Sequence, residues 1–262
     1  MIGCGNMASA MLRAWIAGGV VAGEDVDVVN RGDRALPPGV RQARSLPAGP
    51  MPDMVVLGIK PQQLAEASAV YAAAVADAPI LLSMLAGVDP ATLGAAFPGP
   101  VPIQTMPNLP VELGRGVVAV HAPAAPPAVR DVVDRLLAPL GLVEWFDDAA
   151  RFDAAGALSG TGPAFLFRVI DALAAGGVAI GVPPEEALRI ALATVEGAAA
   201  MAAGSDRSPA TLADAVASPG GMTRAGLDVL DQDAALRALF ERTLRAVAQR
   251  GAEMAAAARG GQ

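Results

Sequence analysis

The first residues with chemical meaning form a glycine-rich turn at the start of the chain. Gly3, Gly5 and Ala8 follow the spacing G-x-G-x-x-G/A. In that pattern the first glycine makes a tight turn, the second lets the backbone approach a pyrophosphate, and the third, small residue lets a helix pack on a strand. Apolar residues recur at helical spacing over 9–17, so a helix should follow with its N-terminus pointing amide groups at phosphate. The turn predicts a dinucleotide site; glycine turns before helices without this role are the alternative.

A second polar segment, Asn30-Arg31-Gly32, ends the strand expected over 25–30. NAD-specific sites usually place a carboxylate at such a strand end, where it binds the ribose 2′-hydroxyl. A carboxylate would repel a 2′-phosphate, whereas the amide of Asn30 and the guanidinium of Arg31 would hold it. We therefore expect NADPH as the cofactor, with NADH as the second choice. The alternative is that this segment forms only a surface turn.

Composition limits the chemistry that the 262 residues can perform. The chain is 53% apolar, has a formal net charge of −7 and contains one cysteine, one histidine and one lysine. Without a basic cluster we expect no nucleic acid partner, and we expect no metal site. Cys4 should be a buried turn residue and His121 a solvated one. The single cysteine, and the lack of a visible signal peptide or an apolar run of membrane-spanning length, predict a cytoplasmic protein that does not contact a membrane.

The first half of the chain alternates short apolar strands with helices, which is typical of a doubly wound parallel sheet. Ligands bind such sheets at the carboxyl ends of the strands, where Asn30, Lys60 and Asn108 fall. Only two residues precede the glycine turn, so we expect the natural start codon to lie upstream of Met1. Strands are expected over 25–30, 54–59, 80–85, 101–105 and 116–120, and a helix over 128–137.

The second half reads as helices only. Ser159-Gly-Thr-Gly-Pro163 predicts a break, with Pro163 opening a helix to residue 180 that is apolar nearly all round. About 110 residues of helices this apolar bury too little surface as a lone domain, so they should pack on a second copy. Four more helices are expected. One begins at Glu185, and a short one runs from Ser208-Pro209 to Ala217. A third ends at Leu230, and the last spans 234–257.

Taken in order, the segments GCGNM, NRG, GIKP, TMPN, SGTGPAF and SPGGMT resemble the pyrroline-5-carboxylate reductase family, over essentially the whole chain. The resemblance implies an α/β fold: an NADP-binding Rossmann-like domain over 1–150, followed by an all-α dimerisation and substrate domain over 151–262. Family dimers assemble further in some members, up to decamers of five dimers. The implied reaction is NAD(P)H-dependent reduction of the cyclic imine 1-pyrroline-5-carboxylate to L-proline, the last step of proline biosynthesis.

The resemblance also implies roles for individual residues. Thr223 is the expected catalytic residue, because its hydroxyl would lie at the ring nitrogen that gains a proton; the alternative is that Thr223 only caps a helix. The implied substrate-binding residues are Ser218, Gly220, Gly221, Met222 and Thr223. The implied cofactor-binding residues are Gly3, Gly5, Asn6, Met7, Asn30, Arg31, Gly58, Lys60, Pro61 and Asn108.

The chain departs from the family pattern at a few positions. Gln104 stands where Arg is frequent, Gly156 where Thr is usual, Thr161 where Ser is common, and Met222 where the residue is usually smaller. These departures keep two alternatives open: a paralogue that reduces another cyclic imine, and a non-catalytic scaffold that binds NADPH. A β-hydroxyacid dehydrogenase is disfavoured, because no lysine follows Lys60 to shuttle a proton.

Overall fold

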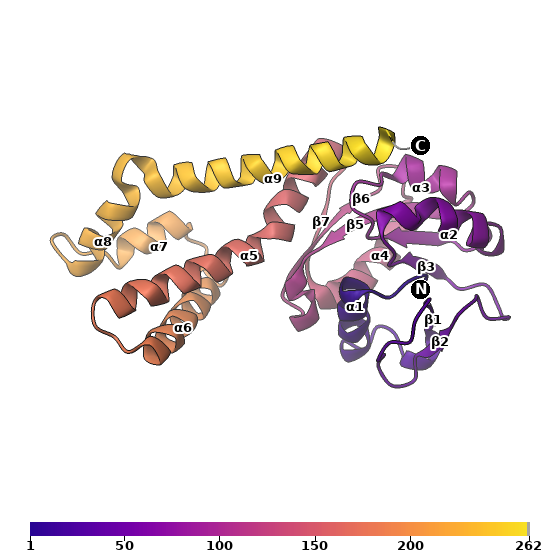
Figure 1. Cartoon of the computed structure of the whole chain (residues 1–262), viewed down its shortest axis with the longest axis horizontal. Helices are drawn as coiled ribbons and strands as arrows, with labels where there is room; N and C mark the ends of the chain where they lie inside the picture. The colour runs from indigo at the N-terminus through magenta and orange to yellow at the C-terminus, as the bar shows by residue number, and fades with distance from the viewer. Residues whose placement is uncertain (261–262) are drawn as a thin grey trace. The chain divides into compact units, whose positions relative to one another are not determined.

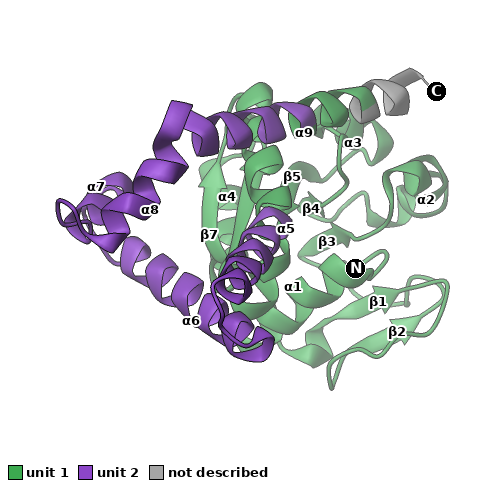
Figure 2. Ribbon diagram, turned by 60° about the vertical axis from the view of Figure 1, so that its left-hand side comes forward, with its two compact units in different colours: residues 1–163, 247–262 green, residues 164–246 purple. Residues whose placement is uncertain are grey.

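The computed structural model describes residues 1–260, with side chains described through Glu253. The chain divides into two compact units: Met1–Pro163 with Val247–Gln262, which contains the sheet, and Ala164–Ala246, which contains helices (Figure 2). The sequence placed the domain boundary at residue 150, whereas the units divide further along, inside one continuous helix. Residues 261–262 of the predicted helical domain lie outside the described residues.

The first unit is built on parallel strands with helices between them (Figure 1). Its helices are α1 (Asn6–Ala17), α2 (Leu64–Tyr71), α3 (Pro90–Ala96) and α4 (Pro127–Leu137). The strands are β1 (Asp27–Val29), β2 (Arg41–Ala43), β3 (Met54–Leu57), β4 (Ile80–Ser83), β5 (Val101–Pro107), β6 (Gly116–His121) and β7 (Gly141–Trp145).

Helices make up the rest of the chain, and one of them is unusually long. Residues 149–179 form the single helix α5, which starts in the first unit and continues into the second. The others are α6 (Pro184–Ala203), α7 (Pro209–Ala215), α8 (Met222–Asp231) and α9 (Ala235–Gly260). The predicted N-cap Ser208 is confirmed, because its hydroxyl accepts a hydrogen bond from the Thr211 amide at 3.2 Å.

Two groups of strands are joined by one residue. β1 pairs with β2, and the remaining strands follow in the order β3-β4-β5-β6-β7. Ile2 lies between β1 and β3 and forms parallel bridges to Val29 on one side and Leu57 on the other. Its amide donates to the Val56 carbonyl at 2.8 Å, and its carbonyl accepts from the Gly58 amide at 2.9 Å. The strand before the glycine turn is therefore a single-residue bridge that holds both halves of the sheet together.

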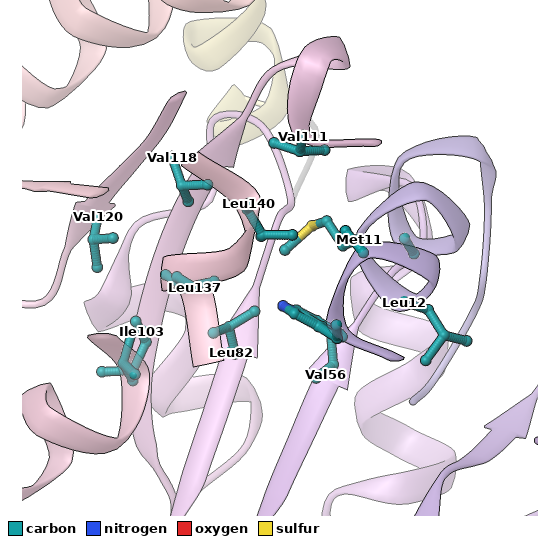
Figure 3. Packing of buried hydrophobic residues seen from close by; sticks show 14 of the residues in the cluster. Met11, Leu12, Val56, Leu82, Ile103, Val111, Val118, Val120, Leu137 and Leu140 are labelled. Atoms are coloured by element: carbon teal, nitrogen blue, oxygen red, sulfur yellow. The ribbon is translucent and has the colours of Figure 1, made fainter. Parts of the chain in front are cut away.

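Alternate residues of the strands serve two separate cores. Val56, Leu82 and Ile103 are in register across β3, β4 and β5, and they pack with Met11 and Leu12 of α1 and with α4 (Figure 3). The neighbouring positions face the other way and pack with α2 and α3 around a fully buried Phe97. Strands buried on both faces explain why the sequence shows continuous apolar runs here rather than alternation.

The sheet departs from the expected parallel order at one pair. β5 and β6 are antiparallel, with Gln104 opposite His121 and Pro107 opposite Val118. The connection over 108–115 forms a short 3-10 turn, whereas a parallel return needs a crossover of about a dozen residues or more. β2 and β7 were not expected from the sequence, because both are short and contain only exposed and half-exposed residues.

One expectation about α5 is wrong. The predicted break at 159–163 does not occur, and the helix continues through Pro163. This helix is also long and apolar enough, by length and composition, to cross a membrane, which makes it the one such helix in the described part of the chain. Charged residues are rare along it, and alanine and glycine dominate where larger apolar residues are absent.

The second unit exposes apolar side chains that a solvated helix would not carry. In α5 and α6 they recur on consecutive turns, and Ile180, just after α5, is 84% exposed. Few side chains of this unit are buried, among them Ala187 and Ala191 of α6. A surface of this kind marks an interaction site. The large apolar residues exposed here in α5 and α6 are Leu166, Phe167, Val169, Leu173, Val178, Leu188, Ile190, Leu192 and Met201.

Candidate functional site

A hollow of about 840 Å³ lies in the first unit where β1 and β3 end and α1 begins. Ligands bind α/β sheets at this edge, because the loops that follow parallel strands converge there. Most residues predicted to bind the cofactor line it, although they are spread over more than fifty positions of the sequence. Those that line it are Gly3, Gly5, Asn6, Met7, Asn30, Arg31, Gly58 and Lys60.

The glycine turn is packed tightly on one side and open on the other. Gly3 has φ +79°, which favours glycine, and a Cβ there would lie 2.6 Å from Ile59 Cγ2. A Cβ on Gly58 would lie 2.5 Å from the Gly3 carbonyl oxygen and 2.8 Å from Ala8 Cβ. A Cβ on Gly5 would meet only the Gly58 carbonyl oxygen, at 3.9 Å. The first and third motif positions therefore serve packing, and Gly5 leaves room for a ligand.

Helix α1 presents its N-terminus to this hollow. Gly5 is the N-cap and offers no side chain, and the first turn contains no acidic residue. The first intrahelical bond runs from the Ser9 amide to the Gly5 carbonyl, at 2.9 Å. The amides of Asn6, Met7 and Ala8 lack an intrahelical acceptor, and they carry the positive end of the helix dipole. This end of the hollow can bind an anion such as a pyrophosphate.

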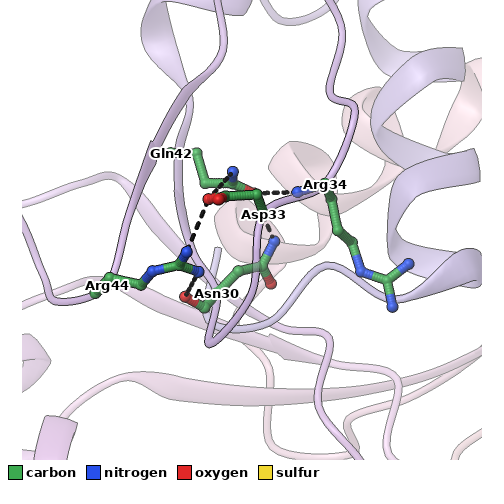
Figure 4. Close-up of polar contacts among 5 residues, drawn as sticks. All are labelled: Asn30, Asp33, Arg34, Gln42 and Arg44. Carbon is green, nitrogen blue, oxygen red and sulfur yellow. Dashed lines mark hydrogen bonds and ion pairs between the residues drawn. The ribbon is translucent and has the colours of Figure 1, made fainter.

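Asn30 connects the glycine turn to the loop after β1 rather than pointing into solvent. Its Oδ1 accepts a hydrogen bond from the Cys4 amide at 2.8 Å, and its Nδ2 donates to Gln42 Oε1 at 3.1 Å. The same Gln42 oxygen accepts from the Arg34 amide at 3.2 Å (Figure 4). The amide predicted to hold a 2′-phosphate is thus engaged on both sides and fixes the position of the turn.

Arginines surround this end of the hollow. Arg44 donates to the Asn30 carbonyl at 3.2 Å and to Asp33 Oδ1 at 2.8 Å, and Arg31 pairs with Glu66. Among the described residues, the Arg34 guanidinium makes no hydrogen bond or ion pair, and Figure 4 shows it pointing away from the polar network.

Sequence reasoning found Arg31 but missed Arg34, Arg44 and the acid Asp33, because only folding of the loop and β2 brings them together. Three guanidinium groups against the carboxylates of Asp33 and Glu66 leave this end of the hollow positive.

A second hollow of about 860 Å³ serves as an internal comparison. It is lined by the first residues of β1, β2 and β3, at the opposite ends of the strands. Glu24, Asp25, Asp27 and Asp53 line it, and a hydrogen bond from Arg41 lowers the pKa of Asp27, so that carboxyl stays ionised. Equal size does not make the two hollows equivalent, because a phosphate would be repelled from the second one.

Two predicted cofactor residues do not line the first hollow. Pro61 begins the 3-10 turn after β3, and the Lys60 amide before it donates to Gln63 Oε1 at 3.0 Å. Asn108 is buried, and its neighbour Pro107 lines the hollow together with Met84 and Met106, which the sequence did not indicate. Apolar strand-end residues of this kind carry no recognisable spacing, so only the structure identifies them.

Cys4 and His121, the only cysteine and the only histidine of the chain, are both buried. Burial raises the pKa of the Cys4 thiol, so it stays protonated. His121 was expected to be solvated but is buried, because β6 lies between β5 and β7 in the sheet. Its Nδ1 donates to the Phe146 carbonyl at 2.7 Å, and its ring packs against Phe152.

The predicted substrate loop lies in the second unit. Gly220 has φ +70°, the Gly221 amide donates to the Ser218 carbonyl at 2.9 Å, and Gly221 is the N-cap of α8. Thr223 is exposed in the first turn of α8 and is not its cap, so the capping alternative is wrong. Met222, beside it, is 94% exposed. Among the described residues, the Thr223 hydroxyl makes no hydrogen bond and is free to meet a ligand.

Known families and proteins resemble this chain along its length. Residues 149–254 match the family model for pyrroline-5-carboxylate reductase dimerisation, and residues 1–87 match the model for NADP oxidoreductases described as coenzyme F420-dependent. The chain is 35% identical to the pyrroline-5-carboxylate reductase of Pseudomonas aeruginosa, covering 97% of this chain and 95% of that protein. It is 33% identical to that of Arabidopsis thaliana, with coverages of 97% and 94%.

Solved structures agree with the sequence relatives. A pyrroline-5-carboxylate reductase from Coxiella burnetii superposes with a TM-score of 0.87 at 27% identity, covering 96% of each chain. A Plasmodium falciparum pyrroline carboxylate reductase, solved with NADP bound, has a TM-score of 0.80 at 21% identity, covering 98% of this chain and 96% of that one. At 21% identity, the similarity to the second structure supports the fold alone.

The glycine geometry predicts opposite effects of two similar substitutions. Gly58→Ala should lower the free energy of unfolding by about 1–3 kcal/mol, because its methyl group meets the Gly3 carbonyl and Ala8. Gly5→Ala should keep the melting temperature and weaken NADPH binding, because its methyl group enters only the ligand space. Thermal melts and NADPH titration of both variants measure the two effects. Equal melting temperatures for Gly58→Ala and wild type would contradict the packing role.

Proposed function

The chain belongs to the pyrroline-5-carboxylate reductase family, and from that premise we propose how its residues reduce 1-pyrroline-5-carboxylate to L-proline. It is an NADP-dependent oxidoreductase acting on a cyclic C=N bond, as its relatives' names and the NADP oxidoreductase match state. The observation that carries the proposal is the phosphate-compatible hollow at the carboxyl ends of the strands, combined with a free threonine hydroxyl in the first turn of α8, after the glycine-rich loop of the second unit.

The residues of the first hollow fit a phosphorylated dinucleotide. The free amides of Asn6 and Met7 would hold the pyrophosphate, and Gly5 gives it access to the backbone. Arg34 and Arg31 would hold the 2′-phosphate, because guanidinium groups bind phosphate oxygens in pairs. Asn30 supports this site through Cys4 and Gln42 instead of touching the phosphate. NADPH, when bound, supplies the hydride.

The protein has to orient the substrate and pass one proton. In the described residues, the only histidine and the only cysteine are buried, and burial keeps the Cys4 thiol protonated. An iminium ion is the better electrophile and forms by protonation of the substrate in mild acid, so orientation is the larger task of the protein. The Gly221 amide already donates to the Ser218 carbonyl, so the first amides of α8, which follow Gly221, would bind the substrate carboxylate. The Thr223 hydroxyl would face the ring nitrogen.

Assembly into an oligomer accounts for the exposed apolar side chains of the second unit. The dimerisation match over 149–254 makes the protein an oligomer, and we propose a homodimer as the basic unit, with larger assemblies up to a decamer built from it. The apolar side chains of α5 and α6 supply the contact surface. This explains the apolar character of α5 without a membrane, and the net charge of −7 fits a cytoplasmic protein that binds neither lipid nor nucleic acid.

The first prediction concerns Thr223. We expect wild-type protein to oxidise NADPH when 1-pyrroline-5-carboxylate is added, and Thr223→Ala to lower kcat roughly ten- to a thousandfold, the scale of one lost orienting or proton-relaying group. Thr223→Ser keeps the hydroxyl and should retain most of the activity. Steady-state kinetics with thermal melts test both. A stable Thr223→Ala protein with wild-type turnover would remove Thr223 from the mechanism.

The second prediction concerns cofactor choice. Arg34→Ala should raise the Michaelis constant for NADPH about tenfold and leave that for NADH nearly unchanged, because the lost contact is to the 2′-phosphate and binds ground and transition states alike. Arg31→Ala should act in the same direction, more weakly, since Glu66 already pairs with Arg31. Arg135→Ala is the matched control, an exposed arginine of α4 outside the hollow. Similar changes for both cofactors would disprove the assignment.

The third prediction concerns assembly. In sedimentation at micromolar concentration we expect a dimer or a multiple of it, with an interface above about 2,000 Å², the range of obligate dimers. Leu173→Asp in α5 should dissociate it, because an unpaired carboxylate would be buried in an apolar contact. Leu113→Asp is the control, since Leu113 is exposed in the first unit. A wild-type chain that sediments as a folded monomer would refute the proposal.

A further inference from the structure

Helix α5 contains a proline in its interior and yet is continuous. Pro163 has no amide hydrogen, so the carbonyl four residues earlier, that of Ser159, loses its intrahelical partner. Ser159 is half-buried, which limits its access to water. Proline inside a helix is normally tolerated only where another group binds the freed carbonyl.

Asn108 binds that carbonyl. Its Nδ2 donates to the Ser159 carbonyl oxygen at 3.0 Å, and its Oδ1 accepts from the Val117 amide at 2.8 Å. The Asn108 amide in turn donates to the Val117 carbonyl at 3.1 Å, so the residue is tied to β6 by its backbone and its side chain. Asn108 is 7% exposed, and both ends of its side-chain amide are occupied. Its donor is therefore held in a fixed direction.

The helix around Pro163 depends on such outside support. The hydroxyls of Ser159 and Thr161 donate back to the carbonyls of Ala155 and Ala157, at 2.8 and 2.7 Å, a pattern that bends helices. The same stretch of α5 packs on the end of β5: a Cβ on Gly156 would lie 3.2 Å from Met106 Cγ. Met106 lines the first hollow. The position of α5 at this point thus reaches the wall of the cofactor site.

We propose that Asn108 is a positioning residue that supplies the hydrogen bond Pro163 cannot make, and so fixes α5 against Met106 at the wall of the cofactor hollow. This role replaces the cofactor contact that the sequence assigned to Asn108. It rests on the proposed function only where activity is the readout, because the helix support itself is measurable by stability.

The pairing predicts that one substitution repairs the other. Asn108→Ala should lower the melting temperature and reduce kcat/KM about tenfold, since one hydrogen bond to a half-buried carbonyl is lost. Pro163→Ala alone should retain wild-type kinetics, because alanine restores the helical amide. In the double variant the restored backbone amide at position 163 donates to the Ser159 carbonyl, so most of the lost stability and kcat/KM should return.

The test compares the melting temperature and the NADPH kinetics of these three full-length variants with those of the wild type. Asn108→Asp adds a second variant, because it keeps the acceptor for the Val117 amide, removes the donor and places a carboxylate against the Ser159 carbonyl; it should lose at least as much activity as Asn108→Ala does. A double variant as impaired as Asn108→Ala would overturn the proposal and return Asn108 to direct contact with the cofactor. Wild-type stability of Asn108→Ala would also overturn it. Because melting needs no substrate, either result is separable from a failure of the proposed reaction.

Discussion

The close approach of two backbone segments holds the first unit together. Ile2 donates to the Val56 carbonyl and accepts from the Gly58 amide, while the Gly3 amide donates to the Val29 carbonyl at 2.8 Å. These bonds form only because neither Gly3 nor Gly58 carries a side chain, as a Cβ on either would overlap the other's backbone. The separation of β1 and β3, the start of α1 and the opening of the hollow all follow from that contact. The phosphate-binding geometry is thus a by-product of strand packing.

Several polar side chains near the cofactor site make their hydrogen bonds within the protein itself. Asn30 and Asn108 both follow strands, and each uses both the oxygen and the nitrogen of its side-chain amide within the fold. An amide suits this task, since it offers a donor and an acceptor without the cost of burying a charge. The hollow is otherwise lined by the backbone at the start of α1 and by the arginines on its rim. A hydrogen-bonded inner layer with exposed charged side chains outside it can keep its shape whether or not a dinucleotide is present.

Patterns with a fixed local period could be predicted from the sequence, and contacts between distant segments could not. The glycine turn, the strands ending near Asn30 and Lys60, and the cap at Ser208 depend on neighbouring residues alone. Arg34, Arg44 and Gln42 join the site through the pairing of β1 with β2, which is too short to leave a signal. The sequence predicts a helix start at Pro163, because propensity alone disfavours proline inside a helix. Its partner Asn108 lies fifty-odd positions away, and a tertiary hydrogen bond outweighed the local preference.

The two hollows at opposite ends of the strands differ in sign, and this has a kinetic consequence. One end presents Arg31, Arg34 and Arg44, and the other presents Glu24, Asp25 and Asp53, in a chain whose net charge is −7. The negative net charge therefore repels an approaching polyanion, whereas the arginines at one end attract its phosphates. This attraction acts before any hydrogen bond forms. This electrostatic attraction acts over about one Debye length and weakens as ionic strength rises. The chain would then recruit its reductant fastest in dilute salt, even though the bound state is set by short-range contacts.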